Sequence, residues 1–233
     1  MVKPVIQVCG DPIVDWLSPR RDGAQAVRLT AEPGGAALLT RLVSTLVPAA
    51  TVEGITISPD SPLLREPGTD DVATTWSVWR QYASDGGRTY RLEAVHERES
   101  GAWKHEVSGL PKPDLLLIDD DNLGFRDDQA AWPRVLKSAG PRPRAIILLQ
   151  RDCGGPLLDH LKATGLAART TLVISVEALR ACSVKVSPSL SWERLFDEVV
   201  AAVLSPACPF LAGSDLAFAR VIVSIGTAGA VMV

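Results

Sequence analysis

Four short segments of this 233-residue sequence carry groups that could bind or transform a ligand. The first, residues 10–15, reads Gly-Asp-Pro-Ile-Val-Asp and directly follows an apolar run. Open α/β sheets bind ligands at the carboxyl ends of their strands, so Asp11 and Asp15 are candidates to accept hydrogen bonds from substrate hydroxyls. Turn formation is the alternative, because Gly-Asp-Pro is also a common turn sequence.

The second segment is the glycine pair Gly34-Gly35 after Pro33, at the expected start of a helix. Glycine lets the backbone approach a ligand closely, and the N–H groups at a helix N-terminus can bind hydroxyls or anions. A plain loop-to-helix junction would show the same sequence.

The third segment is the acidic run Asp119-Asp120-Asp121, followed by Asn122, at the end of another apolar run. Adjacent carboxylates repel one another, which costs stability unless water, a metal or hydroxyls receive them. A solvated loop is the alternative, because charged runs are usually solvated.

The fourth segment, residues 224–230, contains Ser224, Gly226 and Gly229 after the last apolar run. Small residues there could accept the flat base or the phosphates of a nucleotide. A tight turn joining two strands is the alternative.

The elements that must position these segments alternate along the chain. Most apolar runs are continuously apolar, as in strands buried on both faces of a parallel sheet. Strands are predicted at 5–9, 51–57, 115–119, 145–149, 171–175 and 221–225. Helices are predicted at 35–46, 127–138, 156–164 and 191–204, the last with Ser191 as N-cap. Strands alternating with helices predict one open, twisted α/β sheet in a single domain spanning residues 1–233.

One stretch breaks this alternation. Two polar–apolar alternating runs, 74–82 and 88–95, flank the sequence Ser-Asp-Gly-Gly. Asp-Gly between two such runs predicts a β-hairpin, because both residues tolerate positive φ. Residues 70–97 are therefore expected to form an antiparallel hairpin, either a lid over a ligand site or an edge without function.

Composition argues against several classes of partner and site. The chain has 24 basic and 27 acidic residues, a net charge of −3 and no basic stripe, so nucleic acid is not expected as a partner. No apolar run reaches the roughly 20 residues of a membrane span, and the N-terminus lacks a signal-peptide pattern, so we expect a cytoplasmic protein with no membrane association. The four cysteines and three histidines show no ligand spacing, so no metal site is expected.

In this order, the segments resemble the ribokinase (PfkB) carbohydrate-kinase superfamily. They match its opening strand with a G-D-x-x-x-D segment, its glycine pair, and its late strand with a G-x-x-G-A turn. The lid region and the strand that ends in the acidic run are similar to the kinase half of bacterial ADP-heptose synthase. The matching segments are 5–15, 33–37, 74–80, 91–93, 114–124 and 221–230.

The resemblance implies a ribokinase-like α/β fold: an open, mostly parallel sheet, flanking helices, and a small antiparallel β lid over a sugar pocket. It also implies ATP-dependent phosphorylation of a hydroxyl, assisted by Mg²⁺. By resemblance, the substrate is held by Asp11, Asp15, Gly34, Gly35, Arg80, Asp121 and Asn122, and the nucleotide lies at Ser224, Gly226 and Gly229.

Three departures from the family pattern bear on activity. Leu38 and Leu39 stand where the family places an Asn that holds sugar hydroxyls, and leucine forms no such bonds. Residues 175–178, Ser-Val-Glu-Ala, do not reproduce the N-x-x-E motif that helps organise magnesium and phosphate. The G-A-G-D segment with the catalytic Asp lies beyond the late turn, and this chain ends at Val233.

We therefore expect the C-terminal part of the fold to be missing, with a homodimer partner or a longer polypeptide covering the exposed end. The departures predict a carbohydrate-kinase-like domain that binds a sugar, a nucleotide or both, with no catalytic residue and no activity as this chain. Two alternatives stay open. One is the N-terminal part of an active ATP- and Mg²⁺-dependent sugar kinase, and the other is a non-catalytic partner-binding or regulatory module.

Overall fold

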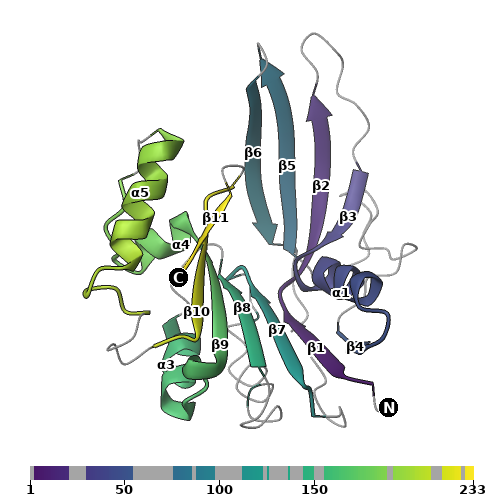
Figure 1. Ribbon diagram of the computed structural model, residues 1–233. Coiled ribbons are helices and arrows are strands. Elements are labelled where there is room, and N and C mark those ends of the chain that lie inside the picture. Colours follow the sequence, from purple (N-terminus) through teal and green to yellow (C-terminus); the bar gives the residue numbers. More distant parts are fainter. Residues whose placement is uncertain are drawn as a thin grey trace.

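The computed structural model describes residues 3–20, 30–54, 76–85, 88–97, 112–122, 125, 136, 144–149, 155–187, 191–210, 217–226 and 229–233. These residues form a larger sheet with helices against it and a smaller sheet that extends from the carboxyl ends of the larger sheet's strands (Figure 1).

The larger sheet has seven strands in the order β11-β10-β9-β8-β7-β1-β4. Every neighbouring pair is parallel except β10–β11, which is antiparallel. This arrangement confirms the predicted open, mostly parallel sheet. The strands are β1 (Val5–Gly10), β4 (Thr51–Glu53), β7 (Leu115–Asp120), β8 (Arg144–Leu149), β9 (Thr170–Ser175), β10 (Arg220–Ser224) and β11 (Ala230–Met232).

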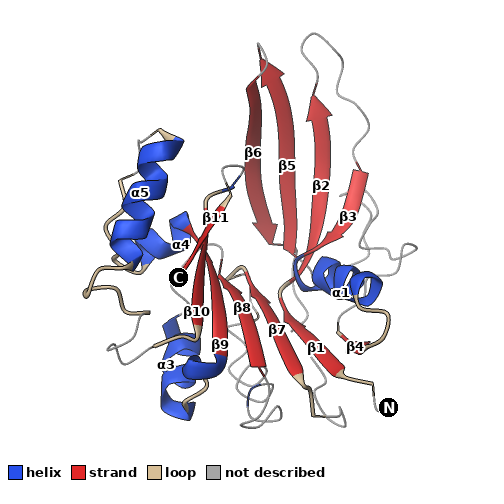
Figure 2. Ribbon diagram, in the orientation of Figure 1, coloured by secondary structure: helices blue, strands red, loops and turns tan. Residues whose placement is uncertain are grey.

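The helices divide between the two faces of this sheet (Figure 2). Helix α1 (Gly35–Leu46) contacts β1, β4 and β7, and it packs there on the small cluster that contains Ile6, Val8 and Leu117. The remaining described helices pack on the other face, in the main core cluster. They are α3 (Gly155–Thr164), α4 (Val176–Ala181) and α5 (Trp192–Val203), with the short 3-10 helix η2 (Ala167–Arg169) before β9.

The predicted helices agree with these bounds where the structure describes them. Residues 35–46 form α1 as predicted, because apolar side chains recur every three to four residues along one side. Ser191 occupies the N-cap position of α5, although its side chain makes no capping hydrogen bond. Of the predicted helix 127–138, only Leu136 lies within the described residues, and it is helical. Helix α4 was not predicted, because six residues are too few to show a periodic pattern.

The smaller sheet extends beyond the predicted hairpin. Strands β5 (Trp76–Asp85) and β6 (Arg88–Glu97) pair antiparallel, which confirms the hairpin itself. They join β2 (Pro12–Arg20) and β3 (Thr30–Gly34) in the order β3-β2-β5-β6, with β2 parallel to β5. Pro33 fits because β3 is an edge strand, where a missing N–H is tolerated.

The sequence did not predict a strand directly after the first one, but β2 begins at Pro12, inside the segment 10–15. The chain therefore passes from the larger sheet into the smaller one within a single residue, Asp11. Across the part of the chain described above, no helix combines the length and the apolar character needed to cross a membrane.

Candidate functional site

The candidate site lies where β1 passes into β2, at the carboxyl edge of the larger sheet. Gly10 ends β1 with φ of +135°, a value that favours glycine, and a Cβ there would overlap the carbonyl oxygen of Asp119 on β7. The backbone N–H of Asp11 donates to that same carbonyl at 2.9 Å. Strands β1 and β7 are therefore held in close contact up to the point where the chain leaves the sheet.

Asp11 ties three segments together at this point. Its carboxylate is 1% exposed, and its two oxygens accept backbone hydrogen bonds from Asp121 N at 2.9 Å and Phe125 N at 2.7 Å. Its carbonyl oxygen accepts a hydrogen bond from Ala36 N, in the first turn of α1, at 2.9 Å. Asp11 thus positions both the loop after β7 and the start of α1, and its predicted contact with substrate stays a prediction.

Asp15 lies against Gly34, the first residue of the glycine pair. It is 5% exposed, on β2, and is paired in register with Glu32 of β3. A Cβ on Gly34 would lie 2.7 Å from the Asp15 Oδ2 atom, which is closer than real Cβ contacts. Because Gly34 has no side chain, the carboxylate can lie directly against the backbone that begins α1.

The N-cap residue of α1 is Gly34, which has no side chain to form a capping hydrogen bond, and the first turn contains no acidic residue. Gly35 has φ of +53°, and a Cβ there would overlap the carbonyl oxygen of Asp11. The buried Asp15 carboxylate therefore lies beside a helix N-terminus, whose partial positive charge favours oxygen-rich ligands.

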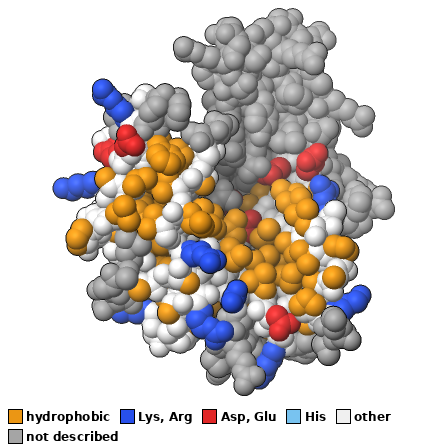
Figure 3. All heavy atoms as spheres, viewed as in Figure 1, with side chains coloured by type: hydrophobic (Ala, Val, Ile, Leu, Met, Phe, Trp, Pro, Cys, Tyr) orange, Lys and Arg blue, Asp and Glu red, His pale blue; other side chains and the backbone are white. Residues whose placement is uncertain are grey.

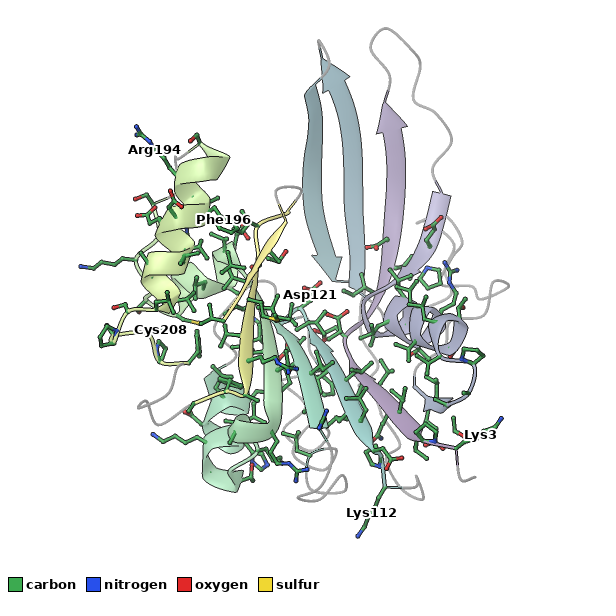
Figure 4. All side chains as sticks on the ribbon, viewed as in Figure 1. Lys3, Lys112, Asp121, Arg194, Phe196 and Cys208 are labelled. Atoms are coloured by element: carbon green, nitrogen blue, oxygen red, sulfur yellow. The ribbon has the colours of Figure 1, made fainter. Side chains whose placement is uncertain are left out.

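The acidic run at the end of β7 is buried, contrary to the alternative of a solvated loop. Asp119, Asp120 and Asp121 are 6%, 0% and 4% exposed. An Asp120 oxygen accepts a hydrogen bond from the backbone N–H of Asn122 at 3.0 Å. Asn122 is exposed and has φ of +58°, a left-handed conformation that Asn tolerates better than most residues. Figure 4 shows Asp121 at the level where the two sheets meet.

The surroundings of this acidic run affect the pKa of a neighbouring thiol. Cys9, on β1, is buried, and its Sγ donates to the carbonyl oxygen of Leu117 at 3.5 Å. Burial raises the pKa of the Cys9 thiol far above its usual value, and the nearby Asp120 carboxylate raises it further. Cys9 is therefore an unreactive thiol of the core, as expected for a buried free cysteine.

The segment predicted to border a nucleotide lies elsewhere along the same edge. Strands β8 and β9 separate β10 from β7. Ser224 ends β10 and pairs with Ala230 of β11, so residues 224–230 connect two antiparallel strands, as the turn alternative supposed. Gly226 and Gly229 have φ of +61° and +113°, and a Cβ on either would meet no atom within 4 Å. A side chain at either glycine would therefore stand in open space.

The structure therefore brings together six of the seven predicted substrate-site residues: Asp11, Asp15, Gly34, Gly35, Asp121 and Asn122. The seventh, Arg80, is on β5 and pairs with Leu17 of β2, two residues beyond Asp15. The sequence analysis did not identify the roles of Gly10 and Phe125, which contribute to the site through their backbones. The glycine directly before Asp11 was a usable signal, whereas nothing in the sequence marks an amide at Phe125.

Among the described residues, no group of three or more His, Cys, Asp or Glu side chains could hold a metal ion. Mg²⁺ is usually held by one or two carboxylates together with the phosphates of the substrate, so its site would depend on the bound nucleotide.

Comparisons with known proteins give no match to any family model and none to the curated proteins. Solved structures that are similar include phosphofructokinase-2 from Escherichia coli in complex with potassium, at 16% identity and a TM-score of 0.45, covering 100% of this chain and 75% of that chain. An uncharacterized sugar kinase from Pyrococcus horikoshii is 12% identical, with a TM-score of 0.47 and coverage of 98% and 73%. A Methanocaldococcus jannaschii nucleoside kinase, named as an archaeal member of the ribokinase family, is 11% identical, with a TM-score of 0.42 and coverage of 98% and 73%.

These solved structures are named as a phosphofructokinase, a sugar kinase and a nucleoside kinase of the ribokinase family. At 11–16% identity and TM-scores below 0.5, no residue's role is taken from them. The finer likeness to ADP-heptose synthase stays a prediction.

Proposed function

We propose that this chain is a ribokinase-type, carbohydrate-kinase-like domain that binds a small polyhydroxylated molecule where its two sheets meet, and that it transfers no phosphate by itself. The observation that carries this proposal is the buried Asp15 carboxylate, which lies against Gly34 at the start of α1.

The chemistry of this junction suits hydroxyl groups. A hydroxyl both donates and accepts a hydrogen bond, and the junction offers a carboxylate as acceptor beside a helix N-terminus as donor. Asp11 keeps these groups in register, because it binds the backbone of α1 and of the loop after β7. A sugar or another polyol is the class of ligand that best uses such alternating donors and acceptors.

The absence of phosphoryl transfer is supported by the segment where the family has N-x-x-E. Ser175 and Glu177 belong to the start of α4, and Ser175 Oγ accepts the hydrogen bond that caps this helix, from Ala178 N at 3.0 Å.

Nucleotide binding is the less supported part of the proposal. The open turn at Gly226 and Gly229 leaves room beside the backbone, as a flat base would need. If ATP binds there, we expect it to act as a ligand without turnover.

The proposal is tested by thermal unfolding of the chain with a panel of sugars, polyols and nucleosides, with and without Mg-ATP. A ligand present at about 100 times its Kd stabilises the native state by about 2.7 kcal/mol, so even weak binding raises Tm. The variant Asp15→Asn should lose most of the shift caused by a sugar or polyol. The matched control Asp197→Asn, at an exposed position on α5, should keep it.

Two results would count against the proposal. No shift with any hydroxyl compound would point to a domain that works without a small ligand. ADP release that depends on an added sugar would show that this chain is an active kinase.

A further inference from the structure

The amino edge of the larger sheet, at the opposite end from the candidate site, carries a row of basic residues. Strands β10, β9, β8, β7 and β1 are consecutive in this sheet and all run parallel, so their amino ends lie at one edge. An exposed Lys or Arg begins each of these strands or precedes it by at most three residues. In the order of the strands, these residues, which we call the basic edge, are Arg220, Arg169, Arg144, Lys112 and Lys3.

The strand register keeps neighbouring members of the basic edge together. Lys3 and Lys112 each stand three residues before the first register pair of β1 and β7. Arg144 and Arg169 each stand one residue before the first register pair of β8 and β9. Adjacent strands are about 4.8 Å apart, so the basic edge crosses about 19 Å of the sheet. Figure 4 shows Lys3 and Lys112 extending away from the body of the molecule, and Figure 3 shows Lys and Arg side chains over the part of the surface where these strands begin.

Acidic side chains offset little of this charge. Among the described residues that begin or directly precede these five strands, Asp114 is the only acidic one. Its Oδ2 accepts a hydrogen bond from the backbone N–H of Val5 at 2.8 Å. The basic edge is therefore positive although the net charge of the chain is −3. The sequence showed no basic stripe because its members are far apart along the chain, and only the parallel sheet brings them to one edge.

Exposed apolar side chains adjoin the basic edge next to Lys3. The backbone N–H of Thr51, which begins β4, donates to the carbonyl oxygen of Pro4 at 2.8 Å. Helix α1 ends shortly before β4, so its last turn lies near the start of β1. Leu46 and Val47, at this end of α1, are 76% and 38% exposed. Basic and apolar side chains are therefore exposed at the same edge of the sheet.

We propose that the basic edge binds the surface of an anionic membrane, with Leu46 and Val47 reaching the lipid headgroups. Anionic headgroups attract nearby Lys and Arg side chains, and exposed apolar side chains add to the binding when they leave water. The candidate site lies at the carboxyl edge of the same sheet, so in this orientation it faces away from the membrane. This inference does not depend on which ligand the candidate site binds.

A nucleic acid and an acidic peptide fit the basic edge less well. Proteins that bind single-stranded nucleic acid stack its bases on aromatic side chains, and Phe218, the described aromatic residue next to Arg220, is only 9% exposed. An extended peptide pairs with an open strand edge, whereas each of the five strands has a neighbour on both sides. The expectation of no membrane association rested on the lack of an apolar span and of a signal-peptide pattern, and contact with a membrane surface requires neither.

The test measures how much of the purified chain sediments with lipid vesicles. The chain should bind vesicles of phosphatidylcholine mixed with phosphatidylserine, bind phosphatidylcholine alone far more weakly, and be released by added salt. Lys112→Glu and Arg144→Glu should each lower the partition coefficient by at least about fivefold, because one basic residue near an anionic surface contributes roughly that factor. The matched control Arg194→Glu makes the same charge change at an exposed position on α5, well away from Lys112 in Figure 4, and should lower it by less than about twofold.

A second pair of variants tests the apolar contribution. Leu46→Ser should lower the partition coefficient on the same vesicles by at least about threefold, because less apolar surface leaves water on binding. Phe196→Ser, at a residue of α5 that is 40% exposed, should leave it unchanged. Circular dichroism of each variant checks that the fold is retained.

Three results would overturn the inference. One is a wild-type chain that stays unbound in the presence of phosphatidylserine vesicles, or that binds phosphatidylcholine alone equally well. The second is binding that Arg194→Glu weakens as strongly as Lys112→Glu does. The third is displacement of the chain from the vesicles by single-stranded DNA or polyglutamate that binds it more tightly, which would assign the basic edge to a nucleic acid or to an acidic protein.

Discussion

The β1–β2 junction and the β10–β11 turn lie at the same edge of the larger sheet, yet they are built in opposite ways. At the junction, Gly10 and Asp11 are in contact with β7, the loop after it and the start of α1. At the turn, Gly226 and Gly229 touch nothing where a side chain would stand. Both glycine-containing segments are weak sequence motifs. The tertiary structure packs closely around the first and leaves the second in open surroundings.

The largest expected effect comes from adding a methyl group to each segment. Gly10→Ala should destabilise the chain by about 4 kcal/mol or prevent folding, because the new Cβ would overlap the Asp119 carbonyl at a positive φ. Gly226→Ala should cost only about 1 kcal/mol, since its φ of +61° is unfavourable for alanine but its surroundings are open. Urea unfolding measures both, and equal losses would show that the two segments are equally constrained.

Removing the Asp11 carboxylate should have the next largest effect. Asp11→Ala leaves the N–H groups of Asp121 and Phe125 without these acceptors, and we expect a loss of about 3 kcal/mol. Asp11→Asn keeps one acceptor oxygen and should lose roughly half as much. Denaturant unfolding of the two variants would contradict this account if they were equally stable, or if Asp11→Ala cost nothing.

A buried polar side chain on β1 should respond in the opposite direction. Gln7 is 2% exposed, and among the described residues neither its Oε1 nor its Nε2 has a hydrogen-bond partner. Burying a polar group without a partner is unfavourable, so Gln7→Leu should stabilise the chain by about 1 kcal/mol. A clear loss of stability in the same unfolding assay would mean that the amide makes a contact in solution.

The last effect appears only at alkaline pH. Burial raises the pKa of the thiols of Cys9 and Cys208 above their usual values. The folded state therefore holds these protons where the unfolded state releases them. The resulting stability is fully present below a pH of about 8.5, the ordinary pKa of cysteine, and it is lost as the pH rises further.

Cys9→Ala should therefore flatten the loss of stability above pH 8.5, by up to about 1.4 kcal/mol per pH unit. Cys208→Ala is the comparison, and its effect should be smaller because the backbone of Phe210 lowers the pKa of that thiol and offsets part of the burial effect. The free energy of unfolding of both variants is measured between about pH 7.5 and 10, a range that brackets the ordinary pKa of cysteine. An unchanged slope for Cys9→Ala would rule out this contribution.

Much of the fold was predictable because its signal is local. The apolar runs of β1, β7, β8, β9 and β10 and the periodic pattern of α1 appear directly in the sequence. The Asp-Gly turn also predicted the β5–β6 hairpin. Strands β2 and β3 were missed because β2 follows β1 after a single residue and β3 contains Pro33. Their pairing with each other and with β5 depends on residues far apart in the chain.

The candidate site also has features that the sequence predicted and features that only the tertiary structure shows. The sequence by itself determined which residues stand at the ends of strands, and so it named Asp11, Asp15 and the glycine pair. Only the tertiary structure decided their roles: Asp11 accepts hydrogen bonds from amides 110 and 114 residues away, while Asp15 lies against Gly34. The physical reason is that strand and helix patterns arise from neighbours along the chain, whereas a carboxylate's partners depend on which distant backbone groups the sheet brings within hydrogen-bond reach.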